Sequence, residues 1–435
     1  DSLRCDLGKS MLRIHRPELA ADIEPVVITG IGMVTSVGNS REATWDAIAR
    51  GESGIRSTRE LPNAPRCLKV AAMVDSTPEI PKQLKVIHLA NLAADEAILD
   101  AKIDFSQIQP HRFGCAISGH MGDWQWLRQH AGKETVQPGD ASNWDQFFPN
   151  SACWNVATKY NLLGPRLCHS TACASGLIDI MGAVNAIRDD RCDIALAGSA
   201  EAIDELFAAG FSQMRVLADT DDPQQASRPF DKNRQGFVMG EGAAMFVVER
   251  LSHALQRQAT IYAEICGGKM MADAHHMTGL DMESEALTRL ISETIRRSNM
   301  DIHEIGYINA HGTGTIQNDV METRGIRRAF GEHANSLCVS SLKSMLGHLV
   351  NASGSVELAL TTLALRDGFV PPTVNLHDPD PLCDLDCLPL QGRTNRVQAA
   401  MKLSLAFGGH LVAVGIRRWN DAATGFQYPA VAKAA

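Results

Sequence analysis

The stretch PRLCHSTACASGLIDIMGAVNAI, residues 165–187, runs from a short apolar segment through small residues around Cys173 into a helical pattern. Ala172, Ala174 and Gly176 leave the Cys173 sulfur sterically open, and residues 177–188 have apolar side chains at helical spacing. The dipole at a helix N-terminus favours a thiolate, and such a turn directs backbone N–H groups toward whatever bonds the sulfur. Buried cysteines are more often small core residues. This stretch alone leaves both interpretations open, nucleophile or packed thiol.

Strands and helices alternate along the rest of the chain. Apolar runs predict strands at residues 26–30, 112–118, 193–198, 261–266 and 305–310, and helical spacing predicts helices at 43–49, 83–101, 177–188, 283–298 and 353–366. This alternation predicts an α/β fold with mainly parallel strand pairing. We expect two halves, residues 26–260 and 261–420, between an N-terminal arm or non-native remnant (1–25) and a C-terminal tail (421–435).

Composition excludes several classes of protein. The chain has 435 residues, 45% of them hydrophobic, which suits a large two-part enzyme. A net charge of −9 and only 5% aromatic residues argue against a nucleic-acid partner. We find no run of membrane-spanning length and no signal-peptide core. The 11 scattered cysteines suit a reducing compartment, so we expect a cytoplasmic protein without a membrane partner.

Two other motifs carry little functional signal. Gly30 and Gly32 nearly match a dinucleotide-binding fingerprint, but its sixth position is Thr35, so we interpret them as a glycine-lined turn between strand and helix. Cys383 and Cys387 lie in an acidic stretch without a matching second pair. This spacing does not support zinc, and we predict no metal site.

Two histidines change the interpretation of Cys173. His311 ends the predicted strand in YINAHGTGT (307–315), and His348 stands in a turn before a long helix in SSLKSMLGHLVNASG (340–354). A single histidine is more often a hydrogen-bonded core or surface residue. Strand-to-helix turns of parallel α/β structures, however, gather at one edge where sites form. One thiol and two imidazoles at such turns suit acyl transfer followed by chemistry on a developing enolate.

Several long motifs, in order, resemble a single family. They are TACASG (171–176), SRPFDKNRQGFVMGEGA (227–243), DAHHMT (273–278), NAHGTGT (309–315), KSMLGH (343–348) and FGG (407–409). From residue 26 to residue 419 the chain is similar to the β-ketoacyl-acyl carrier protein synthases, most closely the type II elongating enzymes of the thiolase superfamily. The resemblance implies a thiolase-like fold, with two similar α/β halves in a five-layered α-β-α-β-α sandwich.

The resemblance also implies a mechanism. Cys173 would attack an acyl-phosphopantetheine thioester, with the backbone N–H groups of Cys173 and Phe407 stabilising the oxyanion. His311 and His348 would donate hydrogen bonds to malonyl-acyl carrier protein as CO2 leaves and the enolate forms. The product would be a 3-oxoacyl chain on acyl carrier protein. This chemistry implies no resident cofactor, because the substrates travel on the carrier protein's phosphopantetheine.

Further residues match family positions near the site. Lys343 and Glu322 match a Lys–Glu pair, which would orient His348 and the local charge or form a plain buried ion pair. The positions that match contacts along the pantetheine tunnel are Thr278, Thr313 and Thr315. All of these roles are implied by the resemblance alone.

The resemblance further implies partners. Arg66, Lys69 and Arg215 lie where the family docks its acidic carrier protein, although each is equally well a solvated surface residue. Met121 matches a position that lines the acyl pocket, often across a dimer interface, so we expect a homodimer. Bulky His120 and Met121 replace a small glycine-rich sequence, which predicts a reshaped or shortened pocket.

The gating loop also departs from the family pattern. Phe407, Gly408 and Gly409 are present, but His410 and Leu411 stand where the family carries Thr-Asn. Together with the changed pocket, this departure favours a specialised lipid or polyketide pathway over routine fatty-acid elongation.

Three other functions are less well supported. Non-catalytic chain-length-factor partner subunits lose the nucleophile, whereas this chain keeps Cys173, His311 and His348. Thiolases that use coenzyme A carry a second cysteine near the C-terminus, and the FGG loop has none. Initiating synthases have asparagine at the third catalytic position, where this chain has His348. The sequence therefore favours an elongating ketosynthase.

Overall fold

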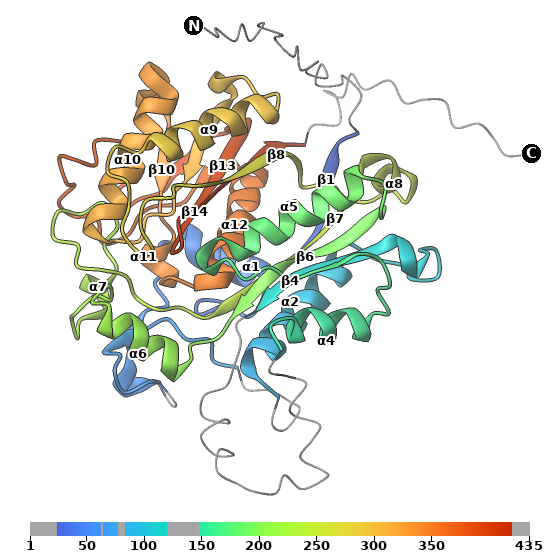
Figure 1. Cartoon of the computed structure of the whole chain (residues 1–435), viewed down its shortest axis with the longest axis horizontal. Helices are drawn as coiled ribbons and strands as arrows, with labels where there is room; N and C mark the ends of the chain where they lie inside the picture. The colour runs from blue at the N-terminus through green and yellow to red at the C-terminus, as the bar shows by residue number, and fades with distance from the viewer. Residues whose placement is uncertain (1–23, 62–63, 77–82, 120–145, 147, 420–435) are drawn as a thin grey trace, which may run out of the picture.

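The computed structural model describes residues 24–61, 64–76, 83–119, 146 and 148–419. Across these ranges one 10-stranded sheet runs through the molecule in the order β10-β9-β13-β14-β8-β1-β7-β6-β4-β5 (Figure 1). Its strands are β1 (Val26–Thr35), β4 (Phe113–Gly119), β5 (Arg166–Leu167), β6 (Ile194–Glu201), β7 (Gly242–Arg250), β8 (Ala263–Ala272), β9 (Ile305–Asn309), β10 (Cys338–Ser340), β13 (Ala399–Ala406) and β14 (His410–Arg418). Two small sheets pair β2 (Arg56–Ser57) with β3 (Val70–Ala71), and β11 (Phe369–Val370) with β12 (Arg393–Thr394).

The sheet consists of two halves with the same succession of elements. The helices are α1 (Arg41–Ala49), α2 (Lys85–Asp100), α4 (Ser151–Lys159), α5 (Ser175–Arg188), α6 (Glu205–Gln213), α7 (Pro223–Ala226), α8 (Leu251–Gln256), α9 (Glu285–Arg297), α10 (Ile316–Phe330), α11 (Lys343–Leu346) and α12 (Ser353–Asp367). The series β1-α2-β4-α4-β5-α5-β6-β7 recurs as β8-α9-β9-α10-β10-α12-β13-β14. The halves join through antiparallel pairing of β1 with β8. Cys173 and His348 thus occupy corresponding turns, before α5 and before α12.

The prediction of mainly parallel pairing is wrong. In each half the two outer strand pairs are parallel, as in β5-β4-β6, and the next two are antiparallel, as in β6-β7-β1. The second half repeats this arrangement. The alternating pattern of strands and helices does not reveal these antiparallel pairs. Strands β13 and β14, for example, are joined by a short turn without a crossover helix.

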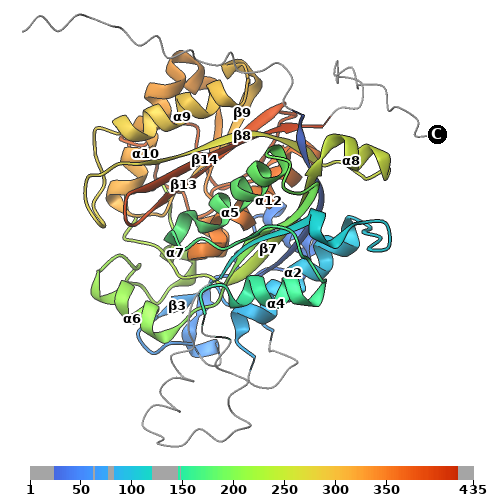
Figure 2. The same ribbon diagram turned by 45° about the vertical axis from the view of Figure 1, so that its right-hand side comes forward.

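Helices and sheet halves form five layers, as the resemblance implied. Helices α5 and α12 lie side by side between the two half-sheets, and each contacts strands of both (Figures 1 and 2). Helices α2 and α4 cover the outer face of the first half, and α9 covers the outer face of the second with α10 beside it.

The central helices are buried on nearly all sides because protein surrounds them. In α12 every position except the last two is buried, and α5 is buried at most of its positions. The outer helix α9 instead buries only one stripe, formed by Leu287, Leu290, Ile291 and Thr294. None of the helices in the described ranges is both long enough and apolar enough to cross a membrane.

Two glycines let the first turns of α5 and α12 touch. A Cβ atom at Gly354 would lie 2.9 Å from Leu177 Cγ, and one at Gly176 would lie 3.1 Å from the backbone oxygen of Asn351. Larger side chains would push the helices apart. This contact fixes the separation of the turns that precede the two helices.

The first strand continues through its glycines, so the predicted turn at Gly30 and Gly32 is wrong. Both residues lie inside β1, and a Cβ atom on either would collide with backbone atoms of α2. The glycines allow α2 to pack directly on the strand, and they do not bind a dinucleotide phosphate.

Replacing Gly32 by alanine therefore has a clear expected cost. In Gly32→Ala the new methyl group meets the Ala93 carbonyl oxygen of α2, and we expect a loss of about 1–3 kcal/mol in the free energy of unfolding. Gly210→Ala in α6 is a matched control, because no atom lies within 4 Å of its Cβ position. The control should gain about 0.5–1 kcal/mol from helix propensity. Equal stability of both variants in urea unfolding would contradict the close packing of α2.

Candidate active site

Cys173 lies in the predicted turn between β5 and α5. It is the middle residue of a 3-10 turn (Ala172–Ala174) that leads directly into the helix. Ala172 has a φ of +47°, so the chain bends sharply just before the cysteine. The Cys173 side chain is only 6% exposed. The structure therefore contains the strand-to-helix elbow, but it buries the thiol.

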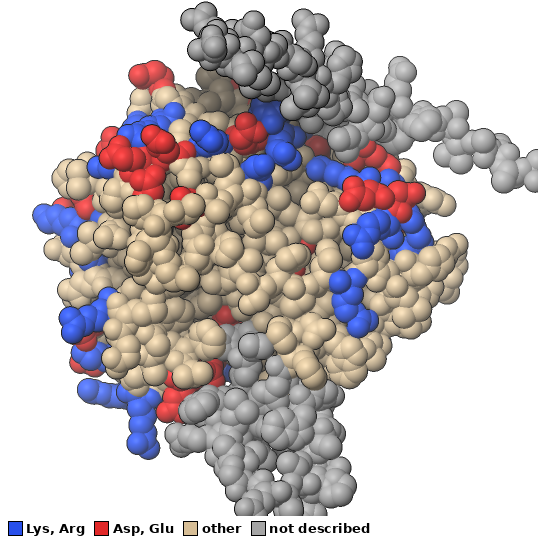
Figure 3. Space-filling model, viewed as in Figure 1, with Lys and Arg blue, Asp and Glu red and all other residues tan. Residues whose placement is uncertain are grey.

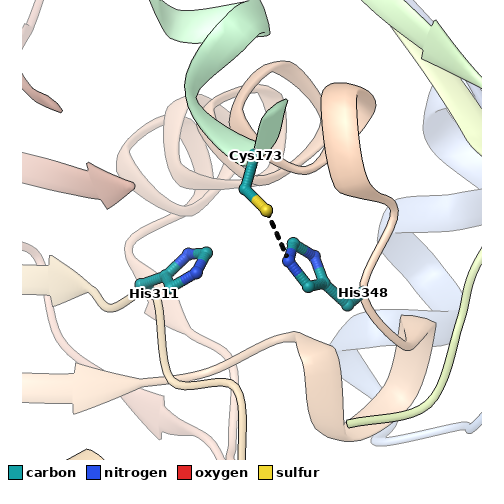
Figure 4. Close-up of side chains that lie close together, drawn as sticks. All are labelled: Cys173, His311 and His348. Carbon is teal, nitrogen blue, oxygen red and sulfur yellow. Dashed lines mark hydrogen bonds between the residues drawn. The ribbon is translucent and has the colours of Figure 1, made fainter. Parts of the chain in front are cut away.

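His311 and His348 reach the same point from the second half. His311 follows β9, and His348 follows α11 after Gly347, whose φ is +67°. The two imidazole rings lie 5.3 Å apart at 84°, with Cys173 beside them (Figure 4). One ligand atom from each of the three side chains lies within 4.8 Å of the others. The structure thus brings together the three residues that the sequence singled out.

The hydrogen bonds of His348 indicate which ring nitrogen carries its proton. Nε2 lies 3.0 Å from Cys173 Sγ (dashed in Figure 4), and Nδ1 lies 2.8 Å from Ser353 Oγ. Ser353 Oγ already accepts the Leu349 N–H at 2.9 Å, and among the described residues its own O–H has no acceptor other than Nδ1. We therefore assign the Ser353 hydroxyl as donor to Nδ1, which leaves the proton on Nε2. In this tautomer Nε2–H donates to the sulfur.

Buried charged side chains hold the backbone of His311. Glu322 accepts the N–H groups of His311 and Gly312 at 2.6 and 2.7 Å, and Lys343 Nζ donates to the His311 carbonyl at 2.7 Å. The predicted pairing of Lys343 with Glu322 is wrong, because Lys343 pairs with Glu357 at 2.7 Å. Lys343 and Glu322 both contact the backbone of His311, not the ring of His348.

Sequence reasoning missed Glu357 and Lys402. Lys402 Nζ lies 2.5 Å from Glu357 and 3.0 Å from the Ala310 carbonyl, so one carboxylate serves two buried lysines. Each residue carried a signal: Glu357 is an acid within an apolar helix, and Lys402 interrupts the apolar strand AAMKLSLA (399–406). A charge in a fully buried element needs a partner, but the sequence does not show which one.

Burial sets the protonation of the three central groups. It lowers the pKa of His311 and of His348 well below the usual value, and the positive charges of Lys343 and Lys402 lower both further. Both imidazoles are therefore neutral at pH 7. Burial also raises the pKa of the Cys173 thiol to about 12, against the opposing influence of Lys343. Burial therefore opposes the thiolate that the helix dipole was expected to favour.

A cavity of about 280 Å³ leads to the centre formed by Cys173, His311 and His348. Its wall includes Cys173, His311, His348 and three residues predicted to line a substrate tunnel, Thr278, Thr313 and Thr315. The hydroxyls of Thr313 and Thr315 lie 2.9 Å apart. Hydroxyl groups along an otherwise mainly apolar channel suit a substrate arm with amide groups.

Phe407 closes one side of this cavity. With Gly408 and Gly409 it forms the turn between β13 and β14, and both glycines have positive φ, +85° and +76°. The strand β13 packs against the turn that carries Cys173. The Phe407 ring lies 6.3 Å from that of Phe211.

Of the three predicted docking residues, Arg215 lines this cavity, whereas Arg66 and Lys69 lie outside it. Arg66 is exposed, while Lys69 and Arg215 line a surface hollow of about 430 Å³ that shares part of its wall with the site cavity. Lys69 also pairs with Asp219 at 2.5 Å, which reduces the local positive charge. Carrier-protein docking stays a prediction, and Met121 lies outside the described residues.

A thiolate and two imidazoles are possible zinc ligands, so Cys173, His311 and His348 could hold a metal ion. Two ligands of a tetrahedral zinc lie about 3.5 Å apart. The separation of 3.0 Å between Cys173 Sγ and His348 Nε2 is that of a hydrogen bond. This geometry suits a protonated donor and its acceptor better than two metal ligands.

Fold and centre together define an α/β acyl-transfer enzyme of thiolase-like architecture. The chain belongs to the β-ketoacyl synthase family: the family models for "Beta-ketoacyl synthase, N-terminal domain" and "Beta-ketoacyl synthase, C-terminal domain" match residues 23–254 and 262–377. It is therefore a ketosynthase.

Curated relatives and solved structures agree with this assignment. The chain is 39% identical to a 3-oxoacyl-[acyl-carrier-protein] synthase 2 of Coxiella burnetii, over 88% of this chain and 96% of the relative. It is 38% identical to the tetracenomycin polyketide synthase ketoacyl synthase alpha subunit of Streptomyces glaucescens, over 90% and 97%. It is also similar to a type II polyketide ketosynthase solved with its acyl-carrier protein and a hexaketide, with a TM-score of 0.85, 32% identity and coverage of 92% and 100%.

The neutral histidines make stability depend on pH. Their folded pKa values lie below the unfolded value of about 6.5, so below that pH the unfolded chain binds protons that the native state does not. Stability should therefore fall with falling pH, by about 1.4 kcal/mol per pH unit for each such histidine. In His311→Gln the slope of unfolding free energy between pH 6.5 and 5, measured in urea, should be smaller by that amount. Equal slopes for both proteins would contradict a neutral buried His311.

Proposed function

We propose that this ketosynthase carries an acyl chain on Cys173 and condenses it with malonyl-acyl carrier protein. The observation that carries this proposal is the Sγ–Nε2 hydrogen bond of 3.0 Å, with the neutral ring of His311 beside it. The relatives named as 3-oxoacyl-[acyl-carrier-protein] synthases and polyketide ketosynthases support the same reaction. Cys173 argues against a role as a non-catalytic chain-length-factor-like subunit.

In the first half-reaction, Cys173 sulfur attacks the thioester carbonyl of an acyl-phosphopantetheine. The new S–C bond forms, the bond to the pantetheine sulfur breaks, and the proton lost by the Cys173 thiol ends on the leaving pantetheine sulfur. Backbone N–H groups of Cys173 and Phe407 are the proposed donors to the oxyanion. Because the resting thiol is neutral, the His348 Nε2–H stabilises the charge that develops on sulfur as its proton leaves.

In the second half-reaction, malonyl-acyl carrier protein occupies the same cavity. Its C–CO2 bond breaks, CO2 departs, and the electron pair forms an enolate whose oxygen accepts hydrogen bonds from His311 and His348. The enolate carbon then attacks the Cys173 thioester, the C–S bond breaks, and the released thiolate takes a proton from solvent. Neither ring nitrogen of His311 has a hydrogen-bond partner within the described part of the chain, so the ring is available to this oxygen.

Other parts of the molecule support the handling of carrier-bound substrates. We propose that Thr278, Thr313 and Thr315 contact the pantetheine arm and that Phe407 gates the malonyl step. The carrier protein would dock near Arg66, Lys69 and Arg215, where an acidic partner meets positive side chains. No resident cofactor is part of this proposal, because imidazoles donate to the enolate.

We further propose a cytoplasmic homodimer. The cysteines in the described ranges are free thiols, in keeping with a reducing compartment. The edge strand β5 has no strand on its outer side among the described residues. The face in Figure 3 carries charged side chains along its top, left and upper right edges and few at its centre, which suits burial against a second copy.

Intact mass of the protein after incubation with acyl-acyl carrier protein tests the nucleophile. We expect one acyl adduct, which Cys173→Ala abolishes and Cys168→Ala retains. Cys173→Ala should still release CO2 from malonyl-acyl carrier protein, because His311 and His348 remain. A folded wild-type protein that forms no adduct with any acyl length would overturn the proposal. If His311→Ala lost the adduct but kept decarboxylation, His311 would act in acyl transfer to Cys173 and not in decarboxylation.

The Ser353 hydroxyl should matter through the tautomer of His348. Ser353→Ala removes the hydroxyl that donates to Nδ1, so the ring no longer holds its proton on Nε2 by preference. We expect decarboxylation of malonyl-acyl carrier protein to slow about tenfold in kcat, equal to about 1.4 kcal/mol, with little change in KM. Ser355→Ala is the matched control, since that hydroxyl bonds Ala352 and Ser199 instead. An unchanged kcat in Ser353→Ala would show that the hydroxyl does not position His348.

A further inference from the structure

The stretch SRPFDKNRQGFVMGEGA, residues 227–243, passes beside the active site, but none of the groups in the proposed reaction belongs to it. Near its middle, the Gly236 N–H donates to the Gly314 carbonyl at 3.0 Å, in the loop that lines the cavity. Two residues further on, the Val238 carbonyl accepts the His348 N–H at 2.6 Å. The motif therefore links the cavity-lining loop to the turn that carries His348.

The loop between β9 and α10 carries two threonines proposed to contact the pantetheine arm. The hydroxyls of Thr313 and Thr315 lie 2.9 Å apart in the cavity wall. The glycines beside them, Gly312 and Gly314, have φ angles of +42° and +76°. Residues 310–315 belong to no helix or strand, so a regular ladder of backbone hydrogen bonds does not hold them. The positions of the hydroxyls depend on contacts from other parts of the chain.

Arg234 supplies such contacts from behind the loop. Its side chain is buried and stands outside the cavity wall. Nε donates to the Thr315 carbonyl at 3.2 Å, and a terminal nitrogen donates to the Ile316 carbonyl at 2.9 Å. The other terminal nitrogen lies 2.6 Å from an Asp380 oxygen. The rigid fork of a guanidinium thus spans two successive carbonyls where the loop enters α10.

Asp319 holds the same loop from a second direction. This carboxylate is fully buried, and it accepts the N–H groups of Gly314 at 3.2 Å and of Phe230 at 2.8 Å. It also lies 3.5 Å from Arg234 Nε. A buried ion pair adds little net stability, because both charges lose their hydration on folding. The fixed geometry that the pair imposes on the loop is therefore its more distinctive contribution.

We infer that Arg234 is a positioning residue for the pantetheine arm: with Asp319 and Asp380, it fixes the loop whose Thr313 and Thr315 hydroxyls contact that arm. The inference rests on the proposed function, because it requires a substrate carried on pantetheine. Arg234 acts only through the loop. Its loss should weaken the binding of substrates that carry the arm and should spare reagents that react with Cys173 without it.

The variant Arg234→Lys tests this role. It keeps a positive charge beside Asp319, but one ammonium group cannot reproduce the fork. The substrate is octanoyl-pantetheine, which has the arm but no carrier protein, and loading of Cys173 is followed by intact mass in single turnover. We expect the concentration for half-maximal loading to rise about tenfold, with the maximal rate within about twofold of the wild-type value. Alkylation of Cys173 by iodoacetamide, which lacks the arm, should keep its rate.

Arg257→Lys is the matched control. The Arg257 fork also bonds a backbone carbonyl, that of Ala101 at 2.7 Å, and a carboxylate, that of Glu249 at 2.9 Å, but away from the cavity. Both loading and alkylation should be unchanged in this variant. If Arg234→Lys does not fold, Asp380→Asn replaces it, because this change only weakens the hold on Arg234. We then expect a rise in the same concentration of about threefold.

Two outcomes would overturn the inference. One is an unchanged concentration for half-maximal loading in the folded variant. The other is an equal slowing of loading and of alkylation, because a general disturbance of the active site would then explain both. A wild-type protein that iodoacetamide alkylates on Cys173, but that octanoyl-pantetheine and octanoyl-acyl carrier protein do not load, would instead overturn the proposed function.

Discussion

The contact between the first turns of α5 and α12 is the constraint on which the centre depends. Gly176 and Gly354 let these turns meet without intervening side chains, and the turns that precede them carry Cys173 and His348. The hydrogen bond of 3.0 Å between these residues joins the two halves of the chain, 175 positions apart in sequence. A displacement of either helix would change this distance directly, since both helices are packed on all sides.

The neutral state of His311 and His348 follows from their burial. Two lysines and two glutamates lie near the histidines: Lys343, Lys402 and Glu322 bind backbone groups around His311, and Glu357 pairs with both lysines. Desolvation keeps the imidazoles neutral, and the lysine charges act in the same direction. Each neutral ring still carries one N–H, which can donate to a developing enolate oxygen. The charged groups thus support the chemistry without touching the substrate.

The sequence predicted the fold class and the three central residues, because strand-to-helix turns place Cys173, His311 and His348 at related points of two similar halves. It did not predict how strands pair, since an alternating pattern does not distinguish a hairpin such as β13–β14 from a crossover. It also misassigned the partner of Lys343, because Glu357 lies on a different element and only the folded chain brings them together. The effect of burial on the Cys173 thiol could not be predicted either: a helix N-terminus is visible in the sequence, but the burial that raises the pKa of the thiol is not.

The position of α12 between both half-sheets has a consequence during synthesis. Helix α5 and the inner face of β7 belong to the first half, yet α12, which covers them, begins only at Ser353. At about 5–20 residues per second, the ribosome needs roughly ten to thirty seconds to make the intervening chain. For that time the parts of α5 and β7 that α12 covers in the finished protein have no cover from their own chain. We therefore expect the nascent protein to need chaperones, or rapid completion, more than two independently folding domains of the same size would.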